Sequence, residues 1–324
     1  FNSIYTSEHY DARLEQPGWS APGFDDSAWG GVMYRGAPSQ NVTAQQTVPI
    51  RNVTRYELRG VRRLDERSYL YDFGQNMAGV TKLRLRGEAG TQLRLIHAER
   101  LREDGHADLS NIDVYFRPTD KDDLFQTDVV TLSGRDDEFM PRFNYKGFRY
   151  VEVVADRPVE LSAENLTAYA MHSDVTPVGH IETSNDLVDK LWDATNKAYL
   201  SNLMGYPTDC PQREKNGWTA DAALAIDLAL LNYDGILFYE KWFDDVADNI
   251  REDGRIAGII PTSSWGYDDW IGPVWDASIL IIPNAIYNYY GDKRTIEKIY
   301  PTVEKYLTYL KTREDSTGLV TYGI

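Results

Sequence analysis

The stretch SDVTPVGHIETSNDL, residues 173–187, marks the point at which the periodicity of the sequence changes. Before it, apolar and polar residues alternate in short runs, as they do in half-buried strands. After it, four apolar residues recur at the spacing of one helix face: Leu187, Leu191, Ala194 and Ala198. Ser184 or Asn185 can cap this helix. The sequence therefore predicts a β part and a helical part that meet near residue 180.

Strand signals dominate from about residue 46 to this boundary. VTKLRLRGEAGTQLRLIHAE, residues 80–99, alternates on both sides of a glycine-containing turn, which predicts a β-hairpin. FRYVEVVA (148–155) and VELSAENLTAYAM (159–171) continue the alternation. Several short strands separated by turns predict a β-sandwich or jelly roll. Before them, residues 1–45 are polar and rich in turns, and we expect a small irregular piece anchored by its aromatic residues: Trp19, Phe24 and Trp29.

The helical part should contain about five helices with short connections. The first begins near residue 185, and the others are expected over four segments: 217–232, 234–250, 274–291 and 295–312. Residues 252–272 predict one longer loop rich in Gly, Ser and Asp. These helices do not make an obviously closed bundle, and we interpret the chain as a fragment cut at both ends. The expected domains are 1–45, the end of an N-terminal accessory β module; 46–180, a β-sandwich; and 181–324, a partial helical barrel.

The composition limits the classes of partner. The chain has 34 Lys and Arg against 50 Asp and Glu, a formal net charge of −16, which argues against nucleic acids and anionic membranes because both would be repelled. No apolar run approaches the length of a membrane span, and no signal peptide is visible. The 22 Tyr and 8 Trp are a generous supply of rings that can stack on the apolar faces of sugars, although each can equally fill the core.

Cysteine and histidine usage excludes other kinds of site. Cys210 is the single cysteine, so the chain has no internal disulfide and no cysteine metal cluster. All five histidines precede the helical part: His9, His97, His106, His172 and His180. A histidine-dependent triad or a multi-histidine zinc site within the helical part is therefore excluded. We expect neither a metal nor a cofactor.

The candidate site is DCPQREKNGWTADA, residues 209–222, just after the architecture changes. The proline after Cys210 disfavours helix there, so Asp209 and Glu214 should lie on a loop, and Asp221 in the first turn of the next helix. If loop and helix fold together, the three carboxylates converge, and their repulsion should raise at least one pKa. A carboxylic acid that stays protonated near neutral pH is what general-acid cleavage of a glycosidic bond requires.

Less specific interpretations compete with this one. From spacing alone, charged residues at a helix start are more often caps and solvated loops, and Asp221 alone is better read as a helix-start residue. Cys210 has no histidine nearby in sequence to activate it, which favours a structural thiol over a nucleophile. Trp218 can stack on a sugar ring, and Arg213 can neutralise one carboxylate. Three further tryptophans either line a cleft or fill the core: Trp265, Trp270 and Trp275.

Residues 209–214 with Gly217-Trp218-Thr219 and Asp221-Ala222 resemble the signature of the α-L-rhamnosidases of glycoside hydrolase family 78. The resemblance spans essentially the whole chain, through segments that match the accessory module, the β-sandwich and the early helices of an (α/α)6 barrel. These segments are EHYDARLEQPGW (8–19), GFDDSAWGG (23–31), YDFGQNMAGVTKLRLRGEAG (71–90), HAERLREDG (97–105), PRFNYKGFRYVEV (141–153) and PVWDASILIIPNAIYNYYGD (273–292).

The resemblance implies hydrolysis of terminal non-reducing α-L-rhamnose with inversion, from rhamnose-containing glycosides or polysaccharides. Glu214 matches the general acid, Asp209 and Asp221 match carboxylates that hold the rhamnose hydroxyls, and Trp218 matches an aromatic that lines the pocket. Further substrate-binding candidates are Arg213, Trp265 and Trp275. The family's general base is a glutamate far downstream, beyond residue 324, so we expect this chain alone to be weakly active or inactive.

Two other functions stay open on the sequence. One is a different inverting (α/α)6 glycosidase or a phosphorylase, although a phosphorylase would need a cationic phosphate pocket that the helical segment does not advertise. The other is a non-catalytic rhamnose-binding protein. The sequence indicates neither the aglycone nor the oligomeric state, and an extracytoplasmic location follows only from the class of substrate.

Overall fold

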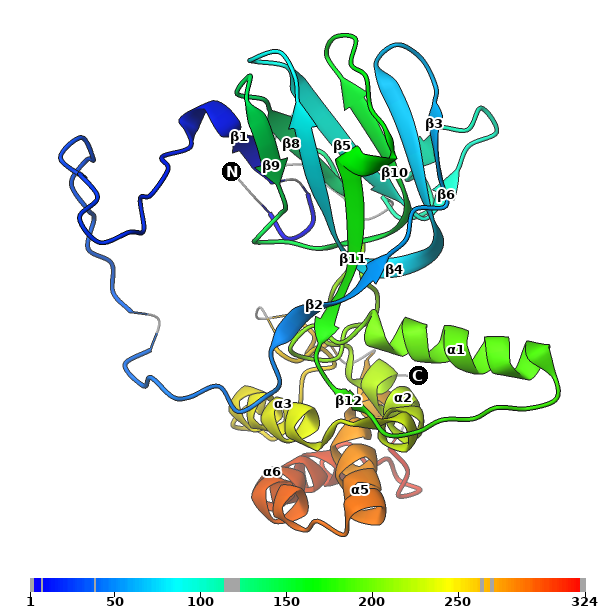
Figure 1. Cartoon of the computed structure of the whole chain (residues 1–324). Coiled ribbons are helices and arrows are strands. Elements are labelled where there is room, and N and C mark those ends of the chain that lie inside the picture. Colours follow the sequence, from blue (N-terminus) through cyan, green and yellow to red (C-terminus); the bar gives the residue numbers. More distant parts are fainter. Residues whose placement is uncertain are drawn as a thin grey trace.

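In the computed structural model, described for residues 3–6, 8–37, 39–113, 123–262, 265–268 and 271–320, the chain forms a sheet part and a helical part (Figure 1). The last strand of the sheet ends at Ser173 and the first helix begins at Asp186, so the change from strands to helices falls between these residues. Strands β2 (Ile50–Tyr56) and β11 (Leu166–Ser173) run from the sheet toward the helices (Figure 1). The two parts are therefore linked by a pair of adjacent antiparallel strands.

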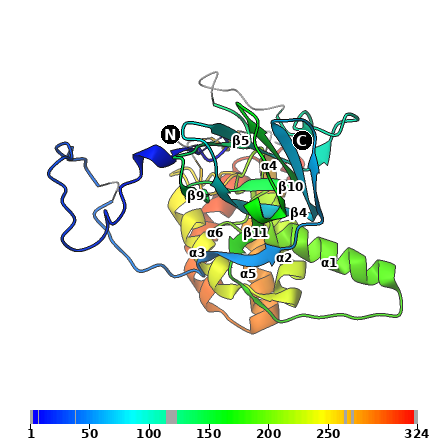
Figure 2. The ribbon, with the colours of Figure 1, turned by 45° about the horizontal axis from the view of Figure 1, so that its top comes forward.

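One curled nine-stranded sheet makes up most of the β part (Figure 2). Its main path runs β1 (His9–Asp11), β8 (Thr127–Thr131), β5 (Gln92–Ala98), β10 (Lys146–Ala155), β4 (Ser68–Arg86), β11 (Leu166–Ser173), β2 (Ile50–Tyr56). Off this path, β3 (Gly60–Arg63) and β9 (Asp136–Phe139) also pair with β4. Two smaller pairs are β6 (Arg100–Leu101) with β7 (Ala107–Asp108), and β12 (Thr176–Pro177) with β13 (Tyr233–Asp234).

The 19-residue strand β4 holds the sheet together because its two ends have different neighbours. Residues 68–72 pair with β10 and β3, whereas residues 79–86 pair with β11 and β9. Between these ends the register with β10 shifts, and Gly74 takes the left-handed φ of 74°. A local irregularity of this kind bends a strand and increases its twist. The bend lets one strand serve two regions of a curled sheet, and the predicted β-sandwich class is confirmed.

The predicted hairpin over residues 80–99 is wrong. Both strands form, as the end of β4 and as β5, but they are not neighbours, because β10 lies between them and pairs with each. The alternation of residues therefore located the strands correctly and assigned them the wrong partner. Both strands bury one face in the sheet core, with Leu83, Leu93 and Leu95 at most 1% exposed, and a distant strand can supply the backbone hydrogen bonds equally well.

The helical part consists of six helices among the described residues. They are α1 (Asp186–Leu200), α2 (Thr219–Asn232), α3 (Ile236–Asn249), α4 (Gly272–Asp276), α5 (Ser278–Tyr290) and α6 (Arg294–Lys311). Asn185 caps α1 by accepting a hydrogen bond from the backbone N–H of Leu187. The five predicted helices are confirmed, except that the fourth is divided at Ala277 into α4 and α5.

Apolar residues of several helices form the core of this part, among them Tyr239, Trp242 and Ile282, each fully buried. The predicted apolar face of α1 is not part of that core. Leu187 and Leu191 are 63% and 60% exposed, and α1 projects from the body of the molecule (Figure 1).

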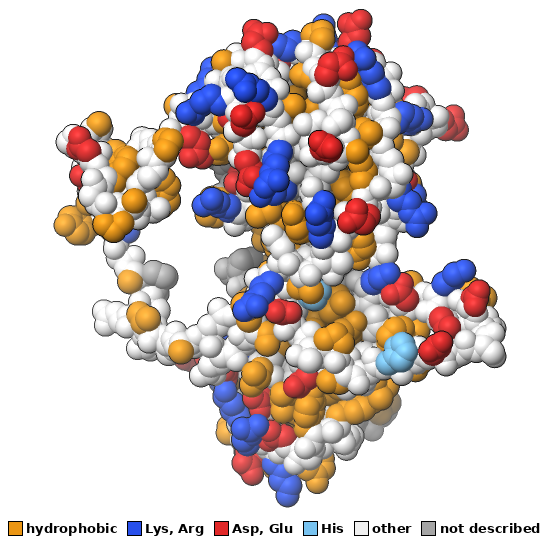
Figure 3. Space-filling view, in the orientation of Figure 1, with side chains coloured by type: hydrophobic (Ala, Val, Ile, Leu, Met, Phe, Trp, Pro, Cys, Tyr) orange, Lys and Arg blue, Asp and Glu red, His pale blue; other side chains and the backbone are white. Residues whose placement is uncertain are grey.

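Figure 3 shows hydrophobic side chains gathered over the helical part, below a more charged sheet part. Among the described residues, no helix combines the length and apolar character needed to cross a membrane.

The N-terminal residues contribute to the sheet and then leave it. β1 pairs in parallel with β8 and extends the edge of the sheet. The chain then runs as a long irregular segment outside the body before it returns at β2 (Figure 1). Within that segment the rings of Phe24 and Trp29 lie 5.6 Å apart, but Trp19 and Trp29 remain about half exposed. These aromatics therefore pack locally rather than against the main sheet.

Candidate active site

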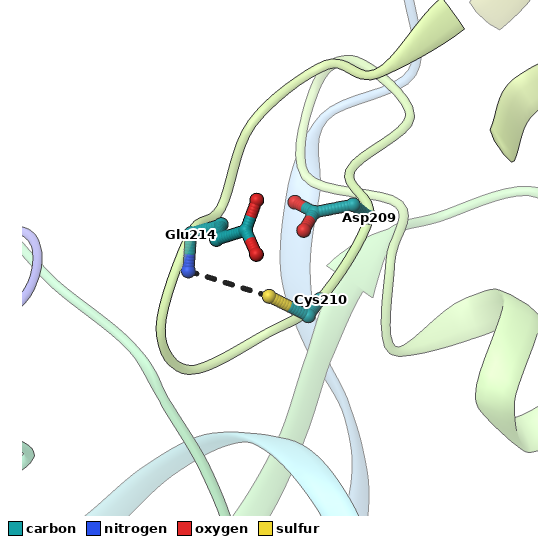
Figure 4. A group of neighbouring side chains, drawn as sticks. All are labelled: Asp209, Cys210 and Glu214. Carbon is teal, nitrogen blue, oxygen red and sulfur yellow. Dashed lines mark hydrogen bonds between the residues drawn. The ribbon is translucent and has the colours of Figure 1, made fainter. Parts of the chain in front are cut away.

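The predicted loop over residues 209–216 folds back on itself between the sheet and α2. Its two ends are joined by two hydrogen bonds: Asp209 N–H donates to the Asn216 carbonyl at 3.0 Å, and Asn216 N–H donates to Asp209 Oδ1 at 2.9 Å. Within the loop, Glu214 N–H donates to Cys210 Sγ at 3.3 Å. These bonds turn the carboxyl groups of Asp209 and Glu214 toward each other across the loop (Figure 4).

The side chain of Glu214 is half-buried and held on both oxygens. Trp218 Nε1–H donates to Oε2 at 3.0 Å, and Arg213 Nε lies 3.6 Å from Oε1. Donor atoms of Asp209, Cys210 and Glu214 all lie within 4.8 Å of one another. The structure therefore brings the predicted acid together with Asp209, Trp218 and Arg213, and it does not point the acid into bulk solvent.

Burial dominates the electrostatics of this cluster. It raises the pKa of Asp209 to about 6, and the nearby Glu214 charge adds to the effect while the hydrogen bonds from Cys210 and Asn216 oppose it. Partial desolvation also raises the pKa of Asp221, again with a contribution from Glu214. Two carboxyl pKa values are thus raised, but not mainly by the repulsion that we expected: loss of solvent is the larger cause, and the Glu214 charge only adds to it.

Cys210 takes part in this cluster as a thiol. Burial raises its pKa, so the thiolate that a nucleophile or a metal ligand requires is disfavoured. Its sulfur accepts the Glu214 N–H, which is a structural use of the group. The ligand atoms of Asp209, Cys210 and Glu214 are close enough together to hold an ion, but burial raises the thiol pKa and so disfavours the thiolate form that would bind it, although the backbone amide donors oppose that effect.

Gly217 explains how two distant tryptophans reach the motif. Its carbonyl accepts the Ile260 N–H at 2.8 Å, and a Cβ at this position would lie 1.9 Å from the Ile260 carbonyl oxygen. Only glycine permits so close a backbone approach, which draws in the loop that carries Trp265. Two residues later, Thr219 Oγ1 donates to the Trp275 carbonyl at 3.0 Å and fixes α4 against the start of α2.

Three tryptophans consequently form one cluster around the N-terminus of α2. The ring of Trp218 lies 5.5 Å from that of Trp265 and 6.1 Å from that of Trp275, in edge-on or tilted arrangements. Trp265 is 47% exposed, so it does not fill the core. Trp270, the third candidate of that loop, lies outside the described residues. The cluster offers apolar ring surface beside the carboxyl of Glu214, which Trp218 contacts directly.

A groove of about 380 Å³ lies between α1 and α2, and its lining includes neither Glu214 nor the three clustered tryptophans. Asp209 and Asp221 both line it, together with apolar side chains such as Leu224 and Leu228. The two predicted hydroxyl-binding carboxylates therefore share one concave surface. Both are within the electrostatic reach of Glu214.

The sheet part supports the loop. Gln212 Nε2 donates to Glu99 Oε2 at 3.1 Å. In β10, a Cβ at Gly147 would lie 3.0 Å from Pro211 Cγ, so the strand passes close to the loop. The loop is therefore not a free surface excursion of the helical part. It is held at the junction of both parts.

Several residues that hold the loop could not be found from the sequence. The Tyr5 hydroxyl donates to the Glu214 carbonyl at 2.7 Å, and the Tyr206 hydroxyl donates to the Lys215 carbonyl at 3.0 Å. Lys215 itself is buried and contacts Tyr145. The sequence shows Lys215 only as one charged residue of the motif. It does not indicate that the side chain is buried, because its partners are far away along the chain.

Comparison with known proteins identifies the family to which this site belongs. Three family models match successive parts of the chain. They are the α-L-rhamnosidase N-terminal domain over residues 1–54, the bacterial α-L-rhamnosidase concanavalin-like domain over 62–172, and the bacterial α-L-rhamnosidase six-hairpin glycosidase domain over 176–322. The chain belongs to the bacterial α-L-rhamnosidase family. Most strands of its sheet lie within the second of these matches and its helices within the third, whereas β1 and most of β2 lie within the first.

Individual rhamnosidases are similar over nearly the whole chain. An α-L-rhamnosidase of Streptomyces avermitilis is 33% identical over 96% of the chain and 29% of its own length. One of Formosa agariphila is 29% identical over the entire chain and 34% of its own length. Among solved structures, the α-L-rhamnosidase from Dictyoglumus thermophilum superimposes with a TM-score of 0.87 at 35% identity, over 96% of this chain and 34% of that one. The chain thus spans about a third of the length of the curated relatives it matches.

Proposed function

We propose that the protein containing this chain hydrolyses terminal α-L-rhamnosides, with Glu214 as the general acid. The observation that carries the proposal is the position of the Glu214 carboxyl, which is half-buried, held by Trp218 and placed within 4.8 Å of the Asp209 carboxylate. An acid that must deliver a proton to a glycosidic oxygen needs such fixed geometry. The Streptomyces avermitilis rhamnosidase, solved in complex with L-rhamnose, is similar over 96% of this chain with a TM-score of 0.87.

The surrounding residues have separate roles in this proposal. Asp209 and Asp221, which line one groove, accept hydrogen bonds from sugar hydroxyls. Trp218, with Trp265 and Trp275 beside it, offers ring faces to the apolar C–H surface of the deoxysugar. Arg213 offsets negative charge at Glu214. Binding thus depends on the carboxylates and rings, and bond cleavage on the proton of Glu214.

A glycosidase also needs a second carboxylate, which either activates water or attacks the sugar. In an inverting glycosidase the two carboxyl groups are separated by roughly 6.5–9.5 Å because a water molecule must fit between them. The oxygens of Asp209 and Glu214 are within 4.8 Å, which is too short for that pair. We therefore propose inversion with a base other than Asp209. The alternative that the short distance favours is retention, with Asp209 as nucleophile, because retaining pairs lie about 5–5.5 Å apart.

The two mechanisms differ in the first sugar that is released. Proton NMR of the full-length protein acting on an aryl α-L-rhamnoside should show β-L-rhamnose before mutarotation. Prior appearance of the α-anomer would replace inversion by retention and make Asp209 the nucleophile.

The acid itself is tested by Glu214→Gln in the full-length protein. The substitution keeps the size and the hydrogen-bond acceptor of the side chain but removes its proton, so kcat should fall by roughly 10²–10⁴ while the affinity for rhamnose is preserved. Glu297→Gln, on the exposed face of α6, is the matched control and should leave kcat unchanged. Near-native turnover in Glu214→Gln would remove Glu214 from the role. Calorimetric binding of rhamnose without any cleavage by the wild type would instead indicate a rhamnose-binding protein.

A further inference from the structure

We propose that Lys215, the residue after the acid, is a positioning residue that fixes Glu214 by anchoring its backbone to the sheet part and to the N-terminal segment. The inference rests on the proposed function, because it concerns the aim of the acid in that reaction. It assigns a role to a side chain that makes no contact with the candidate sugar-binding groups and that the chemistry of the motif does not require.

The contacts of Lys215 are unusual for a loop lysine. Its side chain is almost completely buried, with the residue only 2% exposed. Nζ donates at 2.6 Å to the Ile4 carbonyl and at 2.6 Å to the Tyr145 carbonyl, and it lies 4.1 Å from the centroid of the Tyr145 ring. One ammonium group thus connects the acid-bearing loop to two segments that are 211 and 70 residues away along the chain.

The backbone beside Lys215 is held as firmly as its side chain. The Tyr5 hydroxyl donates to the Glu214 carbonyl at 2.7 Å, and the Tyr206 hydroxyl donates to the Lys215 carbonyl at 3.0 Å. Lys215 also has a φ of 54°, in the left-handed region that non-glycine residues seldom adopt. Two consecutive peptide groups, starting with that of the acid, are therefore fixed by side chains from outside the loop.

The energetics argue that this arrangement serves more than packing. Burial of an ammonium group is costly unless hydrogen bonds and a ring face compensate it, and here burial lowers the pKa of Lys215 well below its ordinary value, with Lys146 adding to the effect and Asp128 opposing it. The left-handed backbone adds a further cost, which any residue other than glycine would share. An apolar residue would fill the same space without the cost of burying an ammonium group. The lysine adds a fixed orientation. Its hydrogen bonds to the Ile4 and Tyr145 carbonyls hold the loop, and with it Glu214, in one rotation.

Lys146 is a natural control for the experiment. It is equally buried, at 0% exposed, and its Nζ donates to Asp128 Oδ1 at 2.7 Å and to Asn144 Oδ1 at 2.6 Å. These partners belong to the sheet part, and neither lies in the loop over residues 209–216. Lys146→Met therefore removes a second buried cation whose hydrogen bonds to Asp128 and Asn144 lie outside the loop, whereas Lys215→Met removes the anchor itself.

The test compares leaving groups in the full-length protein. The substrates are α-L-rhamnosides whose leaving groups range from dinitrophenyl to alkyl. A dinitrophenolate can leave with little help from a general acid, whereas an alkyl leaving group must be protonated. In Lys215→Met, kcat should fall about 10–100-fold for the alkyl rhamnoside and less than about threefold for the dinitrophenyl compound, with KM changed less than about twofold. In Glu214→Gln, kcat should also fall more for the alkyl than for the dinitrophenyl rhamnoside, and the difference between the two should be larger. Lys146→Met should lower Tm but leave the dependence on the leaving group as in the wild type.

A uniform loss across the series in Lys215→Met, or the same trend in Lys146→Met, would refute the positioning role while leaving the rhamnosidase proposal intact. If Lys215→Met does not fold, Tyr5→Phe decides, because it removes one hydroxyl from the Glu214 carbonyl; a series unchanged from the wild type would then refute the inference. A wild type that cleaves no rhamnoside in the series would overturn the proposed function and this inference with it.

Discussion

At the scale of single residues, the site gives different surroundings to two carboxyl groups that stand five positions apart. Glu214 is bound by Trp218 on one oxygen and lies near Arg213 on the other. Asp209 is bound by the backbone of Asn216 and faces the groove between α1 and α2. Glu214 is thus fixed by neighbouring side chains, and Asp209 by the backbone of its own loop. This difference supports separate roles for them.

The raised pKa of Asp209 makes a prediction about stability. A carboxyl whose pKa rises from 3.8 to about 6 on folding contributes stability that is complete below pH 3.8 and is lost as the pH rises through about 6. Asp209→Asn cannot ionise, yet its amide oxygen can still accept the Asn216 N–H. The Tm of the variant minus that of the wild type should therefore increase between pH 4 and pH 8 in thermal unfolding.

Asp72 provides the control of opposite sign. Its carboxylate forms a bidentate ion pair with Arg149, and this pair lowers the pKa of Asp72. Asp72→Asn should therefore lose stability relative to the wild type as the pH rises from 3 to 7. A Tm difference for Asp209→Asn that is flat with pH, or that follows the Asp72 trend, would contradict the assignment of a desolvated carboxyl at position 209.

The sequence predicted these residues to different extents, for physical reasons. Asp209, Glu214, Trp218 and Asp221 lie within 13 positions of one another, and a proline and a helix start between them limit how far they can separate. Lys215 has partners far away along the chain. Local spacing contains no information on such contacts, so a buried anchor and a solvated lysine look the same in the sequence.

At the scale of elements, the close approach of two loops at Gly217 determines whether the tryptophan cluster forms. Gly217→Ala places a Cβ where the Ile260 carbonyl oxygen now lies, 1.9 Å away, and backbone on both sides leaves little room to relax. We expect a loss of roughly 2–4 kcal/mol in the free energy of unfolding, because overpacking and the broken Ile260–Gly217 hydrogen bond add together. Urea unfolding measures this loss.

Gly60→Ala is the matched control, because nothing lies within 4 Å of a Cβ built at that position in β3. It should change the free energy of unfolding by less than about 0.5 kcal/mol. Tryptophan fluorescence should also change in Gly217→Ala, since the displaced loop carries Trp265. Equal, small effects of both substitutions would show that the loop at 258–260 does not need its contact with Gly217.

Element types were easier to predict than element partners. The helices follow from a 3.6-residue period and the strands from a two-residue period, and both patterns arise from burial of one face. Pairing is different, because β10 inserts between β4 and β5 although 47 residues separate the end of β5 from the start of β10. The turn residues of 86–92 are compatible with a hairpin, yet β10, which also buries one face in the core, pairs with both strands instead. The domain limits near residues 45 and 180 remain predictions.

At the scale of the whole molecule, the helical part exposes large apolar side chains on its helices. Leu187 and Leu191 on α1 and Leu224 on α2 are between 60% and 88% exposed. Contiguous exposed apolar surface marks a site of contact. The chain spans about a third of the length of its relatives, and the model that matches its helices describes a six-hairpin domain. We therefore expect other helices of the whole protein to pack against these faces.

Leu224→Gln tests this expectation when it is placed both in the 324-residue chain and in the full-length protein. Leu224 is 88% exposed here, so the substitution should change the free energy of unfolding of this chain by less than about 0.5 kcal/mol. In the full-length protein, burial of the same side chain against another helix would make the cost roughly 2 kcal/mol or more. Leu230→Ala, at a position only 5% exposed, should cost roughly 2–5 kcal/mol in both. A Leu224→Gln substitution that is neutral in both proteins would mean that this face of α2, beside Asp221 and the groove, stays open to solvent.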